Sequence, residues 1–138
     1  MKNAEEIMKE DQASYLPVFA RYPIVLDHGD GSYVWDVNGR KYLDALGGIA
    51  VNVLGHNYAP LVDAIAEQAK RLIHVSNLYY TEPQADAAAK LSALTAGGKV
   101  FFGNSGAEAN EGAIKAARKY AHTIRPNKSQ IITALGSF

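Results

Sequence analysis

Residues 99–120, KVFFGNSGAEANEGAIKAARKY, constrain the fold most, because they predict a strand, a tight turn and a helix in direct succession. The apolar run at 100–102 is typical of a short, buried parallel strand. Small residues at 103–107 then predict a turn, and alanines recur at helical spacing as far as Tyr120. A strand that leads directly into a helix is typical of α/β folds.

The turn offers backbone N–H groups to a ligand. Ser105 and Glu108 have the S-x-x-E spacing of a capping box. Other N–H groups at a helix start can bind an anion, and the small side chains here allow a phosphate to approach closely. An ordinary capped joint has the same spacing, since the segment contains neither G-x-x-x-x-G-K-[ST] nor G-x-G-x-x-G. On spacing alone the ordinary capped joint is favoured, and the residues indicate only that a small anion or phosphate could bind there.

The composition excludes several classes of protein. Among the 138 residues, 14 Lys and Arg balance 14 Asp and Glu, which argues against binding to nucleic acid or an anionic membrane. There is no cysteine, and the four histidines have no metal-ligand spacing, so we expect no metal site. No apolar run approaches the ~20 residues of a membrane helix, and the polar N-terminus is unlike a secretory signal. These features predict a cytoplasmic protein.

The N-terminal half predicts a small antiparallel sheet. Two turn dipeptides, Asp30-Gly31 and Asn38-Gly39, divide residues 24–44 into a β-meander. Residues 45–58 are irregular and apolar, and we expect them to lie against another surface or a cleft. The remaining expected elements are helices at 2–13, 59–73 and 83–94 and a strand at 129–133.

This order predicts an α/β fold in two parts. Residues 1–58 form an N-terminal segment with the β-meander, and residues 59–138 begin a larger α/β domain. The second part contains one complete strand–helix–strand crossover. A two-stranded parallel sheet cannot cover both of its faces or protect its edges. We therefore expect the chain to be truncated within a larger domain.

A family resemblance makes the turn far more specific. The string NSGAEANEGAIKAARKYA closely resembles the phosphate-binding segment of the class III (ornithine-type) aminotransferases, which use pyridoxal 5′-phosphate. The segments GSYVWDVNGRKYLD and SNLYYTEP resemble the family as well. The resemblance implies the N-terminal portion of a fold-type I transferase. It implies that Ser105, Gly106 and Ala107 bind the cofactor phosphate and that Phe138 stacks on the pyridine ring.

Within class III, GGIAV followed by LGH looks most like the acetylornithine aminotransferases. Ornithine δ-aminotransferases carry an aromatic residue at the position of Ile49. The resemblance implies that Ile49 faces the substrate, whereas the residues alone would place it in the core. For the intact enzyme it implies transamination between N-acetylornithine and 2-oxoglutarate in arginine biosynthesis, by a homodimer. Succinylornithine, ornithine and 4-aminobutyrate aminotransferases share much of the pattern and remain alternatives.

The catalytic residues of the family are not expected in this chain. In the family, the Schiff-base lysine and the acid that pairs with the pyridine nitrogen lie downstream of the position of Phe138. No lysine here stands in the family's lysine motif. The resemblance therefore implies that these 138 residues alone are inactive. A non-catalytic interaction or dimerisation module is the alternative function.

Overall fold

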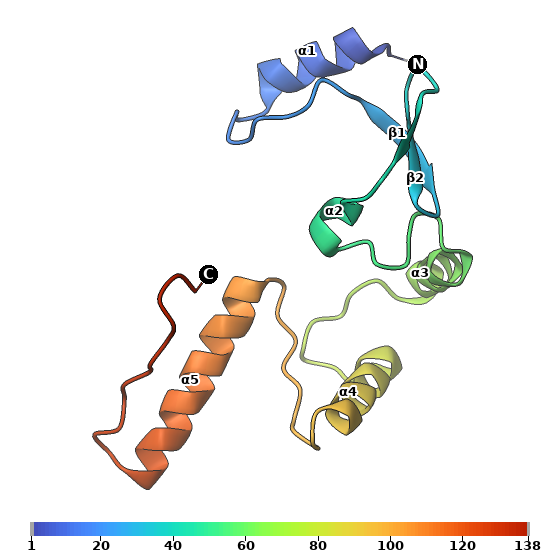
Figure 1. Cartoon of the computed structure of the whole chain (residues 1–138). Coiled ribbons are helices and arrows are strands. Elements are labelled where there is room, and N and C mark those ends of the chain that lie inside the picture. The colour runs from blue at the N-terminus through green and yellow to red at the C-terminus, as the bar shows by residue number, and fades with distance from the viewer. Residues whose placement is uncertain (1, 138) are drawn as a thin grey trace. The chain divides into compact units, whose positions relative to one another are not determined.

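The computed structural model describes residues 2–137, and the chain divides into two compact units, Met1–Val75 and Ser76–Phe138. Figure 1 shows the elements in chain order. The first unit holds the N-terminal helix, the antiparallel sheet, the short turn α2 (Gly47–Ala50) and the helix after it. The second unit holds the helices that begin at Glu82 and Gly106. The domain boundary that we expect between residues 58 and 59 concerns the intact domain and stays a prediction.

The first helix, α1 (Ala4–Ser14), confirms the polar helix expected at 2–13. Its N-terminus carries a reciprocal capping box. The Asn3 side chain accepts from the Glu6 N–H, and the Asn3 N–H donates to the Glu6 carboxylate, both at 2.9 Å. Because these contacts are local in sequence, they explain why so polar a segment begins its helix here.

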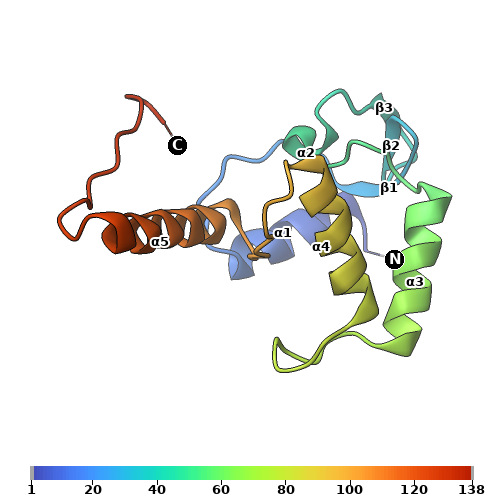
Figure 2. The same ribbon diagram turned by 90° about the horizontal axis from the view of Figure 1, so that it is seen from below.

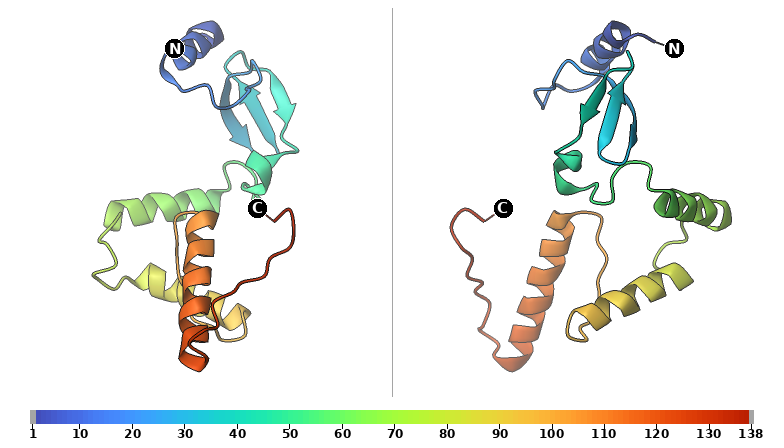
Figure 3. Two further views of the ribbon diagram at one scale, coloured as in Figure 1. Left: turned by 90° about the vertical axis from the view of Figure 1, so that its left-hand side faces the viewer. Right: turned by 45° about the vertical axis from the view of Figure 1, so that its right-hand side comes forward.

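The β-meander is confirmed as three antiparallel strands in the order β1 (Leu26–Asp30), β2 (Tyr33–Asp36) and β3 (Lys41–Leu43). Figure 2 labels all three, and both views of Figure 3 show the sheet. The two turn glycines, Gly31 and Gly39, have φ values of 53° and 81°. Glycine adopts this left-handed backbone without a steric penalty, which is why the two dipeptides mark the turns.

One face of the meander is the better buried. Val34 and Asp36 are each 8% exposed. The Asp36 carboxylate accepts from the N–H groups of Asn38 and Arg40, at 2.9 Å each, and from the Tyr42 hydroxyl at 2.8 Å. These bonds, led by that from Arg40, hold the pKa of Asp36 below its usual value, and the Asp36 bond raises the pKa of Tyr42. A charged group thus closes the second turn.

The helix expected at 59–73 is confirmed as α3 (Ala59–Arg71), with Pro60 in its first turn. The helix expected at 83–94 is confirmed as α4 (Glu82–Leu94). The third, α5 (Gly106–Ile124), extends past Tyr120. Gly112 leaves room for the segment before α5, because a Cβ there would lie 3.1 Å from the Phe101 ring.

The two strands expected at 100–102 and 129–133 do not form. Both segments lack strand pairing in the described structure, and Phe101 is 73% exposed rather than buried. Both nevertheless run opposite to α5 in Figure 1, as the strands of a crossover unit would. A strand requires hydrogen bonds to a neighbouring strand, and no other segment of residues 2–137 supplies them. The apolar pattern predicted the direction correctly and the pairing and burial wrongly.

Candidate functional site

Three predicted site residues, Ser105, Gly106 and Ala107, lie together where α5 begins. Ser105 is the N-cap, with an extended backbone (φ −152°, ψ 163°), and its Oγ accepts from the Glu108 N–H at 3.2 Å. The Glu108 carboxylate accepts from the Asn104 N–H at 2.5 Å rather than from Ser105. Only the serine half of the expected capping box therefore forms, and the glutamate half reaches one residue further back.

The backbone N–H groups of Gly106 and Ala107 point to the function of this turn. We find no hydrogen-bond acceptor for either among residues 2–137. The first N–H groups of any helix lack intrahelical partners, and the 19 residues of α5 add their dipole. A Cβ added at Gly106 would meet no atom within 4 Å. Two open donors, a helix dipole and unobstructed space together suit a phosphate group.

The predicted substrate-side residue, Ile49, lies in the N-terminal unit, on α2 (Gly47–Ala50). This single turn is left-handed. Gly47, Gly48, Ile49 and Ala50 have φ values of 55°, 66°, 61° and 60°. Left-handed backbone costs about 1–2 kcal/mol for each L-residue other than glycine, and a β-branched residue adopts it rarely. The Ile49 side chain is 81% exposed, so burial within this chain does not offset that cost.

Asp44 holds the start of this turn. Its Oδ1 accepts from the N–H groups of Leu46 (3.1 Å) and Gly47 (2.8 Å). Its Oδ2 lies 2.7 Å from Nε2 of His56, and Nδ1 of His56 lies 3.0 Å from the Asn52 side-chain nitrogen. The imidazole donates from Nε2 and accepts at Nδ1 in the tautomer that satisfies both contacts. The bond from His56, followed by that from Gly47, lowers the pKa of Asp44.

His56 is in turn fixed against the meander. Its backbone exchanges two hydrogen bonds with Gly31, at 2.9 and 2.8 Å. Its ring occupies the space where a side chain at Gly29 would stand, since a Cβ there would lie 2.5 Å from Cγ of His56. We call Asp44, Asn52 and His56 the loop latch, because they join the two ends of the segment that carries α2.

Sequence reasoning missed the loop latch. His56 stands in the LGH segment without a predicted role, and the sequence pattern assigns none to Asp44 or Asn52. The sequence feature that could have predicted the loop latch is Asp44 shortly before the Gly47-Gly48 pair, together with His56 directly after Gly55. The predicted stacking residue, Phe138, lies outside the described residues.

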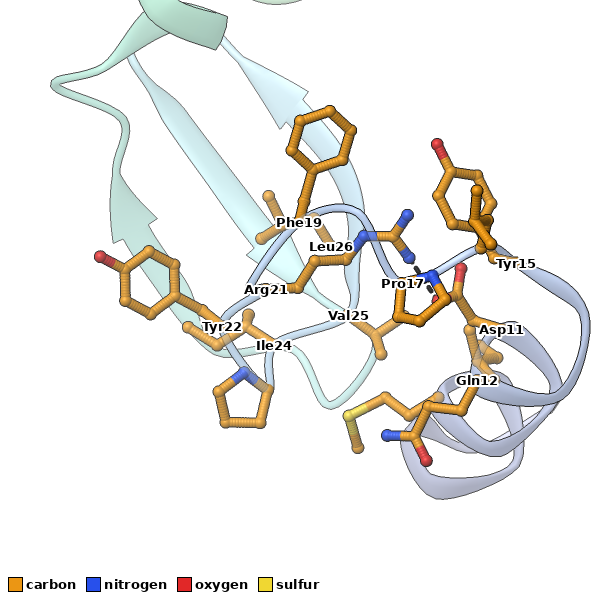
Figure 4. Close-up of a pocket in the computed structure, with 14 residues that line it drawn as sticks. Asp11, Gln12, Tyr15, Pro17, Phe19, Arg21, Tyr22, Ile24, Val25 and Leu26 are labelled. Carbon is orange, nitrogen blue, oxygen red and sulfur yellow. Dashed lines mark hydrogen bonds and ion pairs between the residues drawn. The ribbon is translucent and has the colours of Figure 1, made fainter.

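A pocket of about 440 Å³ lies between α1 and the segment that follows it (Figure 4). Arg21 is the cation among its lining residues, and it is paired with Asp11, which raises the pKa of Arg21. The Arg21 guanidinium also lies 4.2 Å from the centre of the Tyr15 ring. Because this charge is already neutralised and stacked, the pocket has little to offer an anion.

A second pocket, of about 380 Å³, lies in the C-terminal unit. It places the loop before α4, including Tyr79 and Tyr80, beside the segment that leads to the turn at 103–108. Its lining residues are Asn77, Tyr79, Tyr80, Thr81, Gln84, Ala85, Ala88, Val100, Phe101 and Phe102. Among the described residues, none of Ser105, Gly106, Ala107 and Ile49 lines it.

Within residues 2–137, no group of three or more His, Cys, Asp or Glu side chains could hold a metal ion. In the same part of the chain, every helix is too short or too polar to cross a membrane.

Comparison with known proteins gives one consistent answer. Residues 17–138 match the family described as Aminotransferase class-III. The chain is 48% identical to the acetylornithine aminotransferase of Methanothermobacter thermautotrophicus over 136 residues, which is 99% of this chain and 34% of that protein. It is 56% identical to that of Caldanaerobacter subterraneus over 124 residues, which is 89% of this chain and 32% of that protein. It thus spans about one third of the length of these relatives.

Solved structures agree. A crystal structure of acetylornithine aminotransferase from Elizabethkingia anophelis matches 94% of this chain and 34% of its own, with a TM-score of 0.87 and 34% identity. An ornithine δ-aminotransferase from Plasmodium falciparum matches 89% of this chain and 32% of its own, with a TM-score of 0.83 and 28% identity. These matches confirm the predicted α/β aminotransferase fold.

Proposed function

This chain belongs to the class III aminotransferases, and we propose that the intact protein that carries it transfers an amino group between N-acetylornithine and 2-oxoglutarate. Class III aminotransferases are enzymes that use pyridoxal phosphate. The choice of substrate rests on the relatives named above, which are acetylornithine aminotransferases at 48% and 56% identity. Arginine biosynthesis is the pathway that such an activity fits.

The unpaired N–H groups at the start of α5 are the observation that carries the cofactor-binding part of this proposal. Gly106 and Ala107 donate them to the cofactor phosphate, and the helix dipole adds to the attraction. The Ser105 oxygen already accepts from Glu108, so its hydroxyl hydrogen remains to donate to the same phosphate. Phe138 stacks on the pyridine ring in this proposal. When bound, pyridoxal phosphate supplies an electron sink for the substrate's α-carbon.

Ile49 contributes to substrate choice. Its exposed aliphatic side chain provides a surface for an uncharged acyl group on the amino donor. A free δ-ammonium would be desolvated there without a partner, which is unfavourable. The residue therefore favours N-acetylornithine over ornithine. Assembly as a homodimer, implied by the family resemblance, and a cytoplasmic location, expected from the composition, stay predictions.

The test is a donor series with the purified intact protein. With pyridoxal phosphate and 2-oxoglutarate present, glutamate formation should be fastest with N-acetylornithine and slower with succinylornithine, ornithine and 4-aminobutyrate. Faster turnover of another donor would replace the proposed substrate while leaving the family unchanged. No turnover of any of the four, in protein that binds pyridoxal phosphate, would favour a non-catalytic role.

A further inference from the structure

The left-handed turn at 47–50 is held in part by side chains that lie outside it. Asp44 binds the N–H groups at the start of the turn, and His56 binds Asp44 from 12 residues further along the chain. Within the turn, the bonds that close it run from Ala50 to Leu46 and from Val51 to Gly47, both at 3.0 Å. Those backbone bonds do not by themselves explain why a β-branched residue stays at positive φ.

Strained backbone persists where its surroundings over-determine it, and such strain gathers at functional sites. The surroundings here are the loop latch. Asn52 orients the His56 ring, His56 orients the Asp44 carboxylate, and Asp44 fixes the turn amides. The missing side chain at Gly29 provides the space in which the His56 ring lies. The chain of contacts therefore runs from the meander to the turn that presents Ile49.

We propose that the loop latch (Asp44, Asn52 and His56) acts as a set of positioning residues. It holds the backbone of α2 in the left-handed conformation and thereby positions the Ile49 side chain against the acyl group of the amino donor. The three residues touch neither substrate nor cofactor in this proposal. They act through the backbone of the turn. The role of Ile49 rests on the proposed function. That the latch holds the turn rests on the structure alone.

Hydrogen exchange of the intact protein tests the holding of the turn. The variants are His56→Ala, which removes the contact to Asp44, and Gly29→Ala, which displaces the His56 ring without removing it. The control is His28→Gln, because His28 lies on the same sheet but contacts Asp27 and Trp35 instead. The amides at 46–52 should exchange faster than in wild type in both latch variants, and at the wild-type rate in the control. Unchanged exchange in both would overturn the latch.

Substrate discrimination tests the positioning of Ile49. The measured quantity is the ratio of kcat/KM for N-acetylornithine to kcat/KM for ornithine. It should fall about tenfold in His56→Ala, the scale of a lost pocket contact, with the affinity for pyridoxal phosphate unchanged. In the double variant with Ile49→Ala, the ratio should equal that of Ile49→Ala alone, because the latch acts only through Ile49. If His56→Ala acted instead by general destabilisation, its effect on the donor ratio would add to that of Ile49→Ala.

The outcomes distinguish a failure of the proposed function from a failure of the positioning role. Wild-type protein that uses neither donor would refute the proposed function, and hydrogen exchange would still decide whether the latch holds the turn. An active enzyme with faster exchange at 46–52 but an unchanged donor ratio would overturn the positioning role. Additive effects in the double variant would overturn it as well.

Discussion

Two glycine-containing turns of this chain, at 44–50 and at 103–108, both bring backbone N–H groups close to a side-chain carboxylate. In the first, Asp44 accepts from both Leu46 and Gly47, so the donors at the start of the turn are used internally. In the second, Glu108 accepts from Asn104 alone and leaves Gly106 and Ala107 without an acceptor among the described residues. The position of one carboxylate thus separates the turn proposed to support Ile49, the supporting turn (44–50), from the turn proposed to bind the cofactor phosphate, the binding turn (103–108).

The difference also explains where the strain lies. The 44–50 turn places Ile49 and Ala50 at positive φ and needs outside contacts to keep them there. The 103–108 turn needs no such support, because Ser105 is in ordinary extended backbone and α5 continues with normal geometry. A binding turn at a helix start is therefore less strained than the supporting turn.

The largest effect is expected at the binding turn. Gly106→Val should weaken binding of pyridoxal phosphate to the intact protein at least about tenfold, since a lost charge-assisted hydrogen bond is worth about 1.5–3 kcal/mol. Within this chain the new side chain meets open space, so folding should be little affected. Absorbance titration with pyridoxal phosphate measures the change.

The matched control for this variant is Gly98→Val, at another glycine without positive φ, where a Cβ meets only the Thr95 oxygen at 3.7 Å. That variant should bind the cofactor as wild type does. Wild-type affinity in Gly106→Val would place the phosphate elsewhere and remove the distinction between the two turns.

The next effect is expected at the supporting turn. Asp44→Ala removes the acceptor for two N–H groups and the partner of His56, so residues 46–52 should lose protection from hydrogen exchange and the Tm should fall. Asp44→Asn keeps one oxygen for the turn but presents an amide donor to Nε2 of His56. Its exchange should lie between those of wild type and Asp44→Ala. Cofactor affinity should stay unchanged in both, and a loss there would mean that the turns are not independent.

A smaller and opposite effect is expected at Ile49. Ile49→Gly should raise the free energy of unfolding by about 1 kcal/mol, because glycine adopts the left-handed backbone without strain and Ile49 is largely exposed. Urea unfolding of the intact protein measures it. Ala50→Gly is a useful comparison, since it relieves strain at a neighbouring position without removing the proposed substrate contact. A marked destabilisation by Ile49→Gly would show that its side chain is buried in the intact protein.

Acid should act on the meander and on the 44–50 turn rather than on the binding turn. The pKa values of Asp36 and Asp44 are both lowered from the ordinary 3.8, so the folded state favours their charged forms. Their stabilisation is fully present above that pH and is lost as the pH falls through the folded pKa. Fluorescence of Trp35, the only tryptophan of the chain, should report this loss below about pH 4.

The variant Asp36→Asn should flatten that pH dependence, whereas Asp63→Asn, at an exposed position of α3, should leave it as it is. A pH profile identical in Asp36→Asn and wild type would mean that the hydrogen bonds to Asp36 do not stabilise the fold.

The smallest effect is expected from Glu108→Gln. The glutamine oxygen can still accept from the Asn104 N–H, so the turn should keep its shape and cofactor affinity should change by less than about threefold. Absorbance titration checks this beside Gly106→Val. A loss as large as that of Gly106→Val would show that the charge of Glu108, and not the open amides, decides binding.

The sequence alone determined the features that depend on near neighbours. Helical periodicity predicted α3, α4 and α5, and the glycines at 31 and 39 marked the turns of the meander, because each signal lies within a few residues. The Ser105 cap was predicted for the same reason, and the family resemblance came from one continuous string.

Only the tertiary structure decided the features that depend on distant residues. The partner of His56 is Asp44, 12 positions away, and its ring fits because Gly29 lies opposite in a paired strand. Gly47 and Gly48 favour a left-handed turn by sequence, but Ile49 and Ala50 do not, so their positive φ depends on those contacts. Strand pairing at 100–102 and 129–133 likewise depends on partners that a local pattern cannot supply. Local free energies fix helices and turns, whereas the side chains that hold a strained loop act across the fold.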